Sequence, residues 1–269
     1  MMVSLLLWLR LQGAYRPSGM RGKPMTDNVR RIAMWSGPRN ISSAMMRSWG
    51  NRPDTLICDE PLYAHYLLKT GTPHPGAEEV IQSQENDWRK VTRTLTEFVP
   101  PGKTIFYQKH MTHHLLPEID RDWLSRLTNA FLIREPREVV ASFAKIAGTP
   151  RIEDTGFRQQ LDIFNWVRSK TGRVPPVVDA RDVLEDPPRL LRLLCDELEV
   201  EFTDAMLSWP PGPRDTDGVW ARHWYDNVLK STTFQPYKAK TEPVPPPLDG
   251  LLREADEIYR QLYEYRLGQ

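Results

Sequence analysis

The stretch "IAMWSGPRNISSAMMRSW", from Ile32 to Trp49, decides the fold class that we expect of this chain. A short apolar run ends at Ser36 and Gly37, and a string of small residues and methionines with helical character follows it. This order predicts a strand, a tight turn and the start of a helix. The dipole and the free amides of a helix start favour an anion. The nucleoside triphosphate signature G-x-x-x-x-G-K-[ST] is absent from the stretch, so we predict that the turn holds a different anion.

The residues of this turn are individually suited to an anion. Gly37 permits a tight turn, and Pro38 fixes the chain and removes a donor. Arg39 can grip a phosphate or a sulfate with two N–H bonds. Ser42 and Ser43 add hydroxyl and backbone N–H groups where the helix begins. The alternative is a capped helix after an ordinary strand, and this stretch alone leaves both interpretations open.

The rest of the chain alternates short apolar runs with helical segments. We predict strands over residues 31–37, 55–61, 104–110, 130–136 and 176–182. We predict helices over Ser42–Trp49, Pro136–Ala147, Pro187–Glu199 and about Leu248–Leu267. Strands that alternate with helices indicate a three-layer α/β fold with a mainly parallel sheet, in which the carboxyl ends of the strands line the site.

Length and composition limit the classes of protein. A chain of 269 residues can bury a core as one domain. The formal net charge of +1 gives no overall case for a nucleic-acid or membrane partner. Cys58 and Cys195 lie in unrelated contexts without C-x-x-C spacing. They are therefore predicted to be reduced thiols in a cytoplasmic protein rather than a disulfide or a zinc site.

The first residues are predicted to lie outside the fold. The apolar run from Val3 to Leu9 is too short to span a bilayer, and no clear basic region or cleavage site accompanies it. We expect a flexible N-terminal extension over residues 1–28, with Met25 as an alternative start, and a single domain over residues 29–269.

A second segment with anion-binding character is "FLIREPREVVASFAK", residues 131–145. Arg134 ends a predicted strand, and Ser142 lies two helical turns further on. An arginine at a strand end and a hydroxyl from the next helix can converge on one phosphate at the carboxyl edge of the sheet. The alternative is a solvated charge cluster in which the neighbouring arginines and glutamates pair with one another.

Together the two segments resemble the motifs of the sulfotransferases that use 3′-phosphoadenosine-5′-phosphosulfate (PAPS). The motif of the type P-R-S-G-[ST]-[ST], which cradles the 5′-phosphosulfate in that family, is matched by Pro38, Arg39, Asn40, Ile41, Ser42 and Ser43. The R-x7-S motif, which binds the 3′-phosphate, is matched by Arg134 and Ser142. The resemblance extends from about Arg30 to Phe202. It implies a P-loop-like fold, PAPS as co-substrate and no catalytic metal.

The resemblance also implies a catalytic base. "QKHMTHHLLP", residues 108–117, resembles the family segment K-T-H-L-P-x-x-L-L-P and places His110 on the catalytic histidine. In that position a neutral imidazole takes a proton from the hydroxyl or amine of the acceptor. The family's lysine falls on Gln108, and Lys109 lies one residue off as a candidate contact of the bridging oxygen. We expect His110→Ala to spare nucleotide binding and to abolish turnover.

A carboxylate is the alternative base. Some relatives use a carboxylate just after the second strand, and "CDEPLYAHY" places Asp59 and Glu60 there. Burial would raise the pKa of such a carboxyl group and allow it to accept a proton. Glu60 is the preferred candidate of the two. A purely structural alternative is that Glu60 pairs with Arg39 in the empty site.

Three nearby histidines also raise the question of a metal. His110, His113 and His114 would share a face if they lay on one helix. His110 is instead predicted at a strand end, and no carboxylate at ligand spacing completes the set, so no metal site is predicted.

The late part of the chain departs from the family pattern. A tryptophan that stacks on adenine in many relatives is replaced by Ala44, and the late R-K-G loop is not found. We expect "GVWARHWYDNVLKSTTF", residues 218–234, to replace that loop, with Arg222 as a phosphate contact and Trp220 or Trp224 as a stacking surface.

The sequence thus predicts sulfuryl transfer to a small-molecule acceptor. The acceptor pocket is expected from residues 63–76, 150–164 and 210–235, which carry no recognisable signature. A small-molecule kinase on a P-loop fold, or a non-catalytic nucleotide-binding sensor, is the alternative function. The oligomeric state cannot be read from the sequence.

Overall fold

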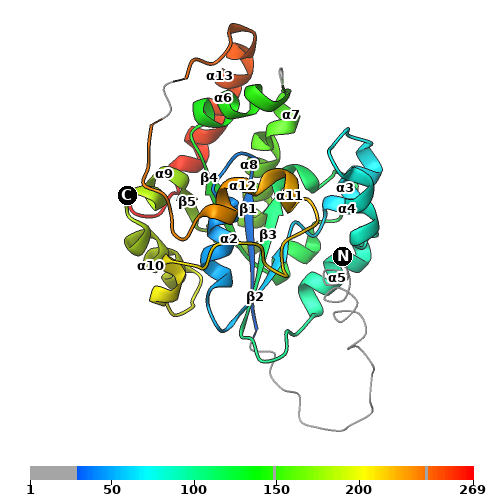
Figure 1. The fold of residues 1–269 in the computed structure, drawn as a ribbon, viewed down its shortest axis with the longest axis vertical. Coiled ribbons are helices and arrows are strands. Elements are labelled where there is room, and N and C mark those ends of the chain that lie inside the picture. Colours follow the sequence, from blue (N-terminus) through cyan, green and yellow to red (C-terminus); the bar gives the residue numbers. More distant parts are fainter. Residues whose placement is uncertain (1–28, 148–149, 240–241) are drawn as a thin grey trace.

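The computed structural model describes residues 29–147, 150–239 and 242–269. The predicted N-terminal extension, residues 1–28, lies outside these ranges. The described residues build a central sheet with helices on both sides (Figure 1).

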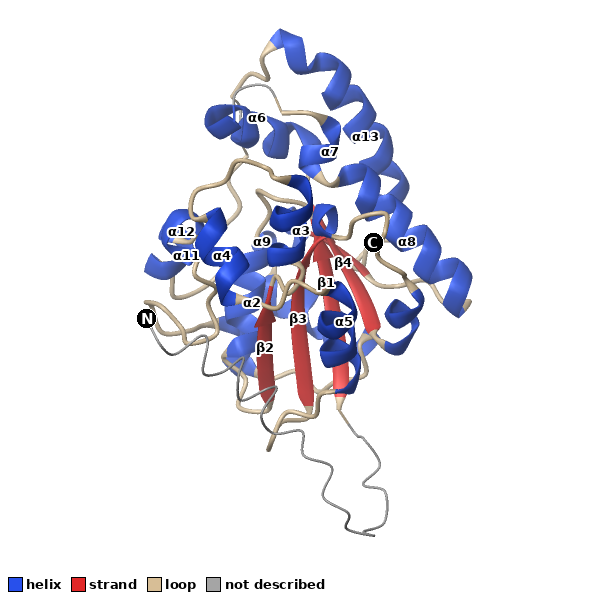
Figure 2. Ribbon diagram, turned by 90° about the vertical axis from the view of Figure 1, so that its right-hand side faces the viewer, coloured by secondary structure: helices blue, strands red, loops and turns tan. Residues whose placement is uncertain are grey.

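The sheet has five strands in the order β2-β3-β1-β4-β5, and every pairing is parallel. The strands are β1 Arg30–Ser36, β2 Thr55–Asp59, β3 Ile105–Met111, β4 Thr128–Ile133 and β5 Val177–Asp179. The five predicted strands and the α/β class are therefore confirmed. Figure 2 shows that the strands all point towards the same end of the molecule. In register, Ser36 of β1 lies beside Met111 of β3 and Leu132 of β4, so the predicted motifs meet at one edge.

The helices follow the sequence pattern only in part. The longer ones are α2 Ser42–Gly50, α3 Tyr63–Thr70, α4 Ala77–Ser83, α5 Trp88–Glu97, α6 Pro136–Ala147, α8 Phe157–Thr171, α9 Ala180–Glu185, α10 Pro187–Glu197 and α13 Asp249–Tyr263. The shorter ones are η1 Thr112–His114, η2 Asp122–Arg126, α7 Ile152–Thr155, η3 Asp204–Leu207, α11 Ala221–Trp224, α12 Asp226–Lys230 and η4 Pro246–Leu248. The four predicted helices correspond to α2, α6, α10 and α13. Two segments predicted only as pocket-lining, residues 63–76 and 150–164, contain α3, α7 and the start of α8.

Side-chain alternation along the strands divides the core into two layers. Met34 packs into the layer that holds α2, α3 and α10, whereas Trp35 packs into the layer that holds α5, α8 and α13. On β3, Tyr107 belongs to the first layer and Phe106 to the second. Consecutive residues near the end of β3 therefore face opposite layers, and this sets the geometry of the site.

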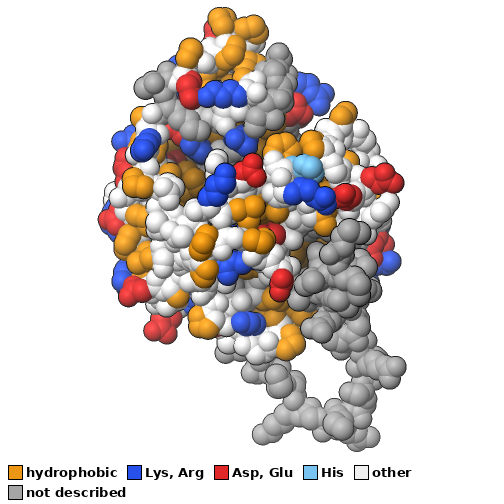
Figure 3. All heavy atoms as spheres, in the orientation of Figure 1, with side chains coloured by type: hydrophobic (Ala, Val, Ile, Leu, Met, Phe, Trp, Pro, Cys, Tyr) orange, Lys and Arg blue, Asp and Glu red, His pale blue; other side chains and the backbone are white. Residues whose placement is uncertain are grey.

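The surface charges and the two cysteines are arranged as the near-zero net charge and the cysteine contexts predicted. Lys and Arg side chains are interspersed with Asp and Glu over the face shown in Figure 3. Both cysteines, Cys58 and Cys195, are free thiols. Among the described residues, none of the helices is both long and apolar enough to cross a membrane.

A tight backbone approach joins the turn between α7 and α8 to the loop after β1. A Cβ atom on Gly37 would lie 2.6 Å from the carbonyl oxygen of Thr155. A Cβ atom on Gly156, whose φ is +75°, would lie 2.4 Å from Oγ1 of Thr112. The Thr112 hydroxyl donates a hydrogen bond to the Gly156 carbonyl oxygen at 2.9 Å. Glycine is required at Gly156 for both its backbone conformation and its lack of a side chain.

We expect Gly156→Ala to lower the free energy of unfolding more than Gly172→Ala does. Gly172 has a similar φ of +68°, but nothing lies within 4 Å of its Cβ position. The free energy of unfolding of the control should therefore fall only by about 1–2 kcal/mol, the cost of a side chain in the left-handed backbone conformation. The free energy of unfolding of Gly156→Ala should fall by at least about 1 kcal/mol more, because the new Cβ atom overlaps Oγ1 of Thr112. Urea denaturation of both variants measures the difference, and equal losses would contradict the close approach.

Candidate active site

The loop after β1 is held in one conformation by Asn40. Its side-chain amide donates to the carbonyl oxygen of Leu132 in β4 at 3.0 Å, and its Oδ1 accepts from the backbone N–H of Ile41 at 2.8 Å. Arg39 has a φ of +60°, which is unfavourable for a residue with a side chain. Such strain is concentrated at functional sites. α2 begins at Ser42, so the loop leads directly into a helix start, as the sequence predicted.

The structure brings the two predicted anion-binding segments together. Nε of Arg39 donates to Oγ of Ser142 on α6 at 3.0 Å, and Nη1 of Arg134 donates to the carbonyl oxygen of Arg39 at 3.0 Å. Burial, with a contribution from the nearby Arg134, lowers the pKa of Arg39. Two like charges held close together in a partly buried place favour an anion. Phosphate binding by these residues remains a prediction.

Arg134 is also part of an ion pair. Its Nη2 and Nε atoms lie 2.6 and 2.9 Å from Oε2 of Glu138. The other carboxylate oxygen of Glu138, Oε1, accepts a hydrogen bond from the hydroxyl of Tyr237 at 2.9 Å. Arg134 thus pairs with a neighbouring glutamate, as the charge-cluster alternative supposed, but the Glu138 side chain is only 3% exposed and the pair is not solvated. The guanidinium has five N–H donors, and its bonds in the described part of the chain use three of them. Donors therefore remain for a ligand.

A buried cluster of charged groups lies at the ends of β2 and β3. Lys109 is 1% exposed, and its Nζ donates to Oδ1 of Asp59 at 3.0 Å, to the hydroxyl of Tyr225 at 3.0 Å and to Oε1 of Glu60. The Tyr225 hydroxyl donates in turn to Oδ2 of Asp59 at 2.7 Å. Burial alone would lower the pKa of Lys109, but the two carboxylates reverse the effect and raise it well above its usual value. Lys109 is therefore a fixed cation inside the protein.

Glu60 is the most accessible carboxylate of this cluster. Its φ of +43° makes it, with Arg39, a second strained residue at the carboxyl edge of the sheet. Burial and the neighbouring Asp59 raise the pKa of Glu60, and Lys109 partly opposes them. A carboxyl group with a raised pKa is a suitable proton acceptor near neutral pH. The partner of Glu60 is Lys109 rather than Arg39, which was the structural alternative.

His110 lies near the carboxyl end of β3, as predicted, but its side chain packs in the core. Its ring stacks on Trp35 at a centroid distance of 4.3 Å, and its Nε2 lies 3.2 Å from Oε1 of Gln108. Burial, followed by the charge of Lys109, lowers the pKa of His110 to about 3. Strand alternation sends residues 108 and 110 to the core layer opposite Lys109. Its surroundings thus do not favour the base role that the resemblance implied.

The other two histidines of this segment lie among aromatic rings. The ring of His114 is stacked against Tyr63 at 4.4 Å and Tyr66 at 4.7 Å, and His113 lies edge-on to Tyr66 at 5.2 Å. Burial lowers the pKa of His113 to about 4 and that of His114 well below its usual value. Within the described ranges, the Nδ1 atoms of both lack a hydrogen-bond partner, and no His, Cys, Asp and Glu group of three or more is placed to hold a metal ion.

The segment 217–225, here called the strap, folds over the charged cluster. Asp217 forms a buried bidentate ion pair with Arg47 of α2, at 2.6 and 2.7 Å. The backbone N–H of Gly218 donates to Oδ2 of Asp59 at 3.4 Å, beside the Tyr225 bond. No sequence pattern identified Asp217 or Tyr225, because their partners lie more than 100 residues away in the chain.

The strap residues singled out in the sequence have other roles. Arg222, predicted to contact phosphate, is paired with Glu79 of α4. Trp220 is 2% exposed and belongs to the core, so it offers no stacking surface in this arrangement. Trp224 is 36% exposed and lies beside the ring of His74 at 5.0 Å. The prediction that this stretch folds over another segment of the protein is correct. The structure gives no support for Arg222 as a phosphate contact or for Trp220 as a stacking surface.

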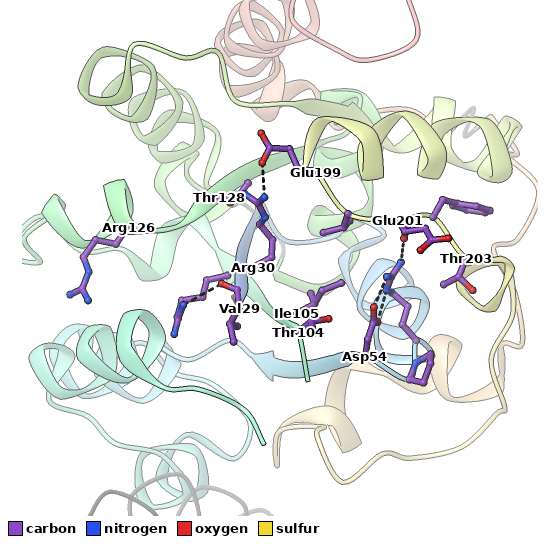
Figure 4. Close-up of a pocket in the computed structure, with 15 residues that line it drawn as sticks. Val29, Arg30, Asp54, Thr104, Ile105, Arg126, Thr128, Glu199, Glu201 and Thr203 are labelled. Atoms are coloured by element: carbon purple, nitrogen blue, oxygen red, sulfur yellow. Dashed lines mark hydrogen bonds and ion pairs between the residues drawn. The ribbon is translucent and has the colours of Figure 1, made fainter. Parts of the chain in front are cut away.

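A cavity of about 830 Å³ lies at the other end of the sheet. It is lined by residues at the amino ends of β1 and β3, among them Arg30 and Thr104, and by the Arg52–Asp54 ion pair (Figure 4). Arg30 is itself paired with Glu199 across the cavity wall. Because the predicted motifs follow the carboxyl ends of the strands, this cavity is not the site that they form.

We expect Lys109→Met to be strongly destabilising. The substitution leaves Asp59 and Glu60 buried without their cation, which costs about 3–5 kcal/mol of unfolding free energy. The control is Lys145→Met, because the Lys145–Glu242 pair is exposed. That variant should stay within about 0.5 kcal/mol of the wild type. Chemical denaturation compares the two, and a small loss for Lys109→Met would contradict the charged cluster.

Comparison with known proteins assigns this chain to a family. Residues 30–264 match the profile of the family described as "Sulfotransferase domain". Three solved structures share the fold. The sulfotransferase domain from the curacin biosynthetic pathway has a TM-score of 0.51 and 16% identity, over 89% of this chain and 99% of that one. The sulfotransferase domain from the Synechococcus PCC 7002 olefin synthase has a TM-score of 0.52 and 16% identity, over 93% of this chain and 100% of that one. A sulfotransferase from Alicyclobacillus acidocaldarius has a TM-score of 0.51 and 12% identity, over 88% of this chain and 97% of that one.

Two curated plant proteins are similar in sequence. The chain is 35% identical over 231 residues to "Branched-chain-amino-acid aminotransferase-like protein 1" of Arabidopsis thaliana, and 34% identical over 203 residues to protein 2 of the same name. The matches cover 86% and 76% of this chain but only 41% and 36% of those proteins. The chain thus spans less than half the length of these relatives, and their names describe longer proteins.

Proposed function

Because this chain belongs to the sulfotransferase family, we propose that it transfers a sulfuryl group from PAPS to a hydroxyl or amine of a small-molecule acceptor. The observation that carries the proposal is the meeting of the loop after β1 with the R-x7-S pair, through the Arg39–Ser142 bond of 3.0 Å. A nucleotide with two separate anionic groups needs two such cradles side by side. The net charge of +1 agrees with a small acceptor rather than nucleic acid. The free cysteines agree with a cytoplasmic location.

In the proposed complex the two cradles have different tasks. The loop Gly37–Ile41, with Arg39, Ser42 and Ser43, would hold the 5′-phosphosulfate at the start of α2. Arg39 would also neutralise the charge that builds on the leaving phosphate. Arg134 and Ser142 would bind the 3′-phosphate, which identifies the nucleotide and takes no part in the chemistry. We propose no metal, in line with the family resemblance.

We now propose Glu60, rather than His110, as the base. Glu60 is strained, has a raised pKa and lies at the carboxyl edge of the sheet, whereas His110 is packed on Trp35 in the opposite layer. Lys109 would act by holding Glu60 in place and by keeping a cation near the transferring group. Positioning and electrostatics would supply most of the rate.

We expect Arg134→Ala to weaken the binding of adenosine 3′,5′-bisphosphate by about tenfold or more, since a charge-assisted hydrogen bond is lost. Binding of AMP, which has no 3′-phosphate, should change little. Arg137→Ala removes an exposed arginine three residues away and serves as the control. Isothermal titration calorimetry measures all three proteins. Equal losses for AMP and the bisphosphate would contradict the assignment. Preference for magnesium-ATP would favour the kinase alternative.

We expect Glu60→Gln to lower kcat by about 10²–10⁴-fold and to spare nucleotide binding, as is usual for loss of a general base. In the wild type the ionised form of Glu60 is the active one. Because its pKa is raised, kcat should rise with pH through a higher range than for an ordinary carboxyl group. His110→Phe is the matched comparison, and it should retain most of the turnover. Loss of turnover in His110→Phe alone would restore the histidine assignment. Nucleotide binding without transfer in the wild type would favour the sensor alternative.

A further inference from the structure

A second cavity, of about 380 Å³, lies between α3 and the start of α5. Its volume falls within the range of about 300–1,000 Å³ that is usual for small-molecule sites. Arg39, Glu60 and Arg134 are not among the described residues that line it. A ligand in this cavity would therefore bind apart from the residues proposed for sulfuryl transfer.

His65 of α3 forms part of the cavity wall, although it is only 2% exposed. Its Nδ1 atom lies 2.9 Å from the carbonyl oxygen of Asn86. A carbonyl oxygen only accepts, so Nδ1 carries the hydrogen, and Nε2 of the neutral ring is an acceptor. In the described part of the chain, Nε2 is buried without a hydrogen-bond partner. Buried polar atoms are rarely left in this state, so Nε2 marks a place for a donor.

A carboxylate stands beside this nitrogen. Oε1 of Glu118 lies 3.5 Å from Nε2 of His65, and Glu118 lines the same cavity. Two acceptors cannot bond to each other, but an ammonium group has three donors and a positive charge and can serve both. Because Nε2 is buried, an ammonium group reaches it when the Glu118 side chain rotates outward. That side chain is 47% exposed and is free to do so.

The rest of the lining adds two cations and an apolar wall. Lys69 and Arg89 supply the cations, and Leu68 and Trp88 supply the apolar wall. Leu68 is 50% exposed, and the Arg89 guanidinium lies 4.5 Å from the centre of the Trp88 ring. Asp87 is a second carboxylate, but it already accepts from the backbone N–H of Arg89 at 3.0 Å. The cations suit a carboxylate, and the apolar wall suits a hydrocarbon chain.

We infer that this cavity binds a free amino acid with an apolar side chain. Its ammonium group lies between His65 and Glu118, its carboxylate lies on the side of Lys69 and Arg89, and its side chain lies on the apolar wall. The two cations and two carboxylates of the lining sum to zero. A zwitterion therefore fits the cavity better than a plain amine or a plain acid does.

The test compares L-norleucine with three analogues. Pentylamine lacks the carboxylate, hexanoate lacks the ammonium group, and L-glutamine has a polar side chain of similar length. Isothermal titration calorimetry measures binding to the wild-type protein at about pH 8, where histidine side chains are mainly neutral. We expect norleucine to bind about tenfold or more tightly than each of the analogues, because each of them loses charge-assisted hydrogen bonds or apolar contact.

Two surface substitutions test the two ends of the ligand. Glu118→Gln should weaken norleucine by about tenfold and narrow the difference between norleucine and hexanoate. Lys69→Met should narrow the difference between norleucine and pentylamine. The matched control is Glu199→Gln, because Glu199 is a 63% exposed carboxylate that lines the cavity at the amino ends of the strands. Norleucine should bind to the control within about twofold of the wild type.

His65→Phe removes Nε2 and keeps a ring of similar shape. It should weaken norleucine and pentylamine, which share the ammonium group, and leave hexanoate unchanged. Because His65 is buried, thermal unfolding is measured first. If this variant does not fold, Glu118→Gln tests the same end of the ligand.

Four outcomes would overturn the inference. Equal affinity for norleucine and either pentylamine or hexanoate contradicts the zwitterion. Equal affinity for norleucine and glutamine contradicts the apolar wall. Equal losses in Glu118→Gln and Glu199→Gln place the ligand elsewhere. No binding at about 10 mM norleucine, where a site with a millimolar Kd is mostly filled, contradicts the site itself.

Discussion

The position of β1 between β3 and β4 is the constraint on which the site depends. Because the three strands are parallel and in register at Ser36, Met111 and Leu132, everything that follows them is delivered to one edge of the sheet. The loop with Arg39 follows β1, and Arg134 follows β4, so these cations meet although they are far apart in sequence. Acidic Glu60 and basic Lys109 arrive at the same edge from β2 and β3.

The buried Lys109 cluster is costly to build, and a buried ion pair is weak evidence for added stability. Taking a lysine and two carboxylates out of water carries a large desolvation penalty, and apolar residues of similar size often do as well or better. The strap contributes Tyr225 and the Gly218 amide to this cluster and is itself fixed by the Arg47–Asp217 pair. We propose that the cluster holds one carboxylate, Glu60, in a defined position, where burial and Asp59 raise its pKa and Lys109 partly opposes them.

The sequence predicted what depends on local pattern and missed what depends on distant contacts. Strand–turn–helix order and the spacing from Arg134 to Ser142 are local, so the five strands and the meeting of the two motifs were predictable. The family resemblance implied His110 as the base, but it carries no information on which face of β3 a side chain occupies. The neighbouring residues Lys109 and His110 face opposite core layers. Tyr225, which lies 116 residues from Lys109, carried no signal, and Trp220 resembled a ligand-stacking residue although it is core.

A crystal structure of the protein with adenosine 3′,5′-bisphosphate is the most direct measurement of the proposed nucleotide site. We expect the 5′-phosphate on the Gly37–Ser43 loop and the 3′-phosphate on Arg134 and Ser142. A nucleotide bound in the cavity at the amino ends of the strands, or bound with its 3′-phosphate away from Arg134, would contradict the central claim.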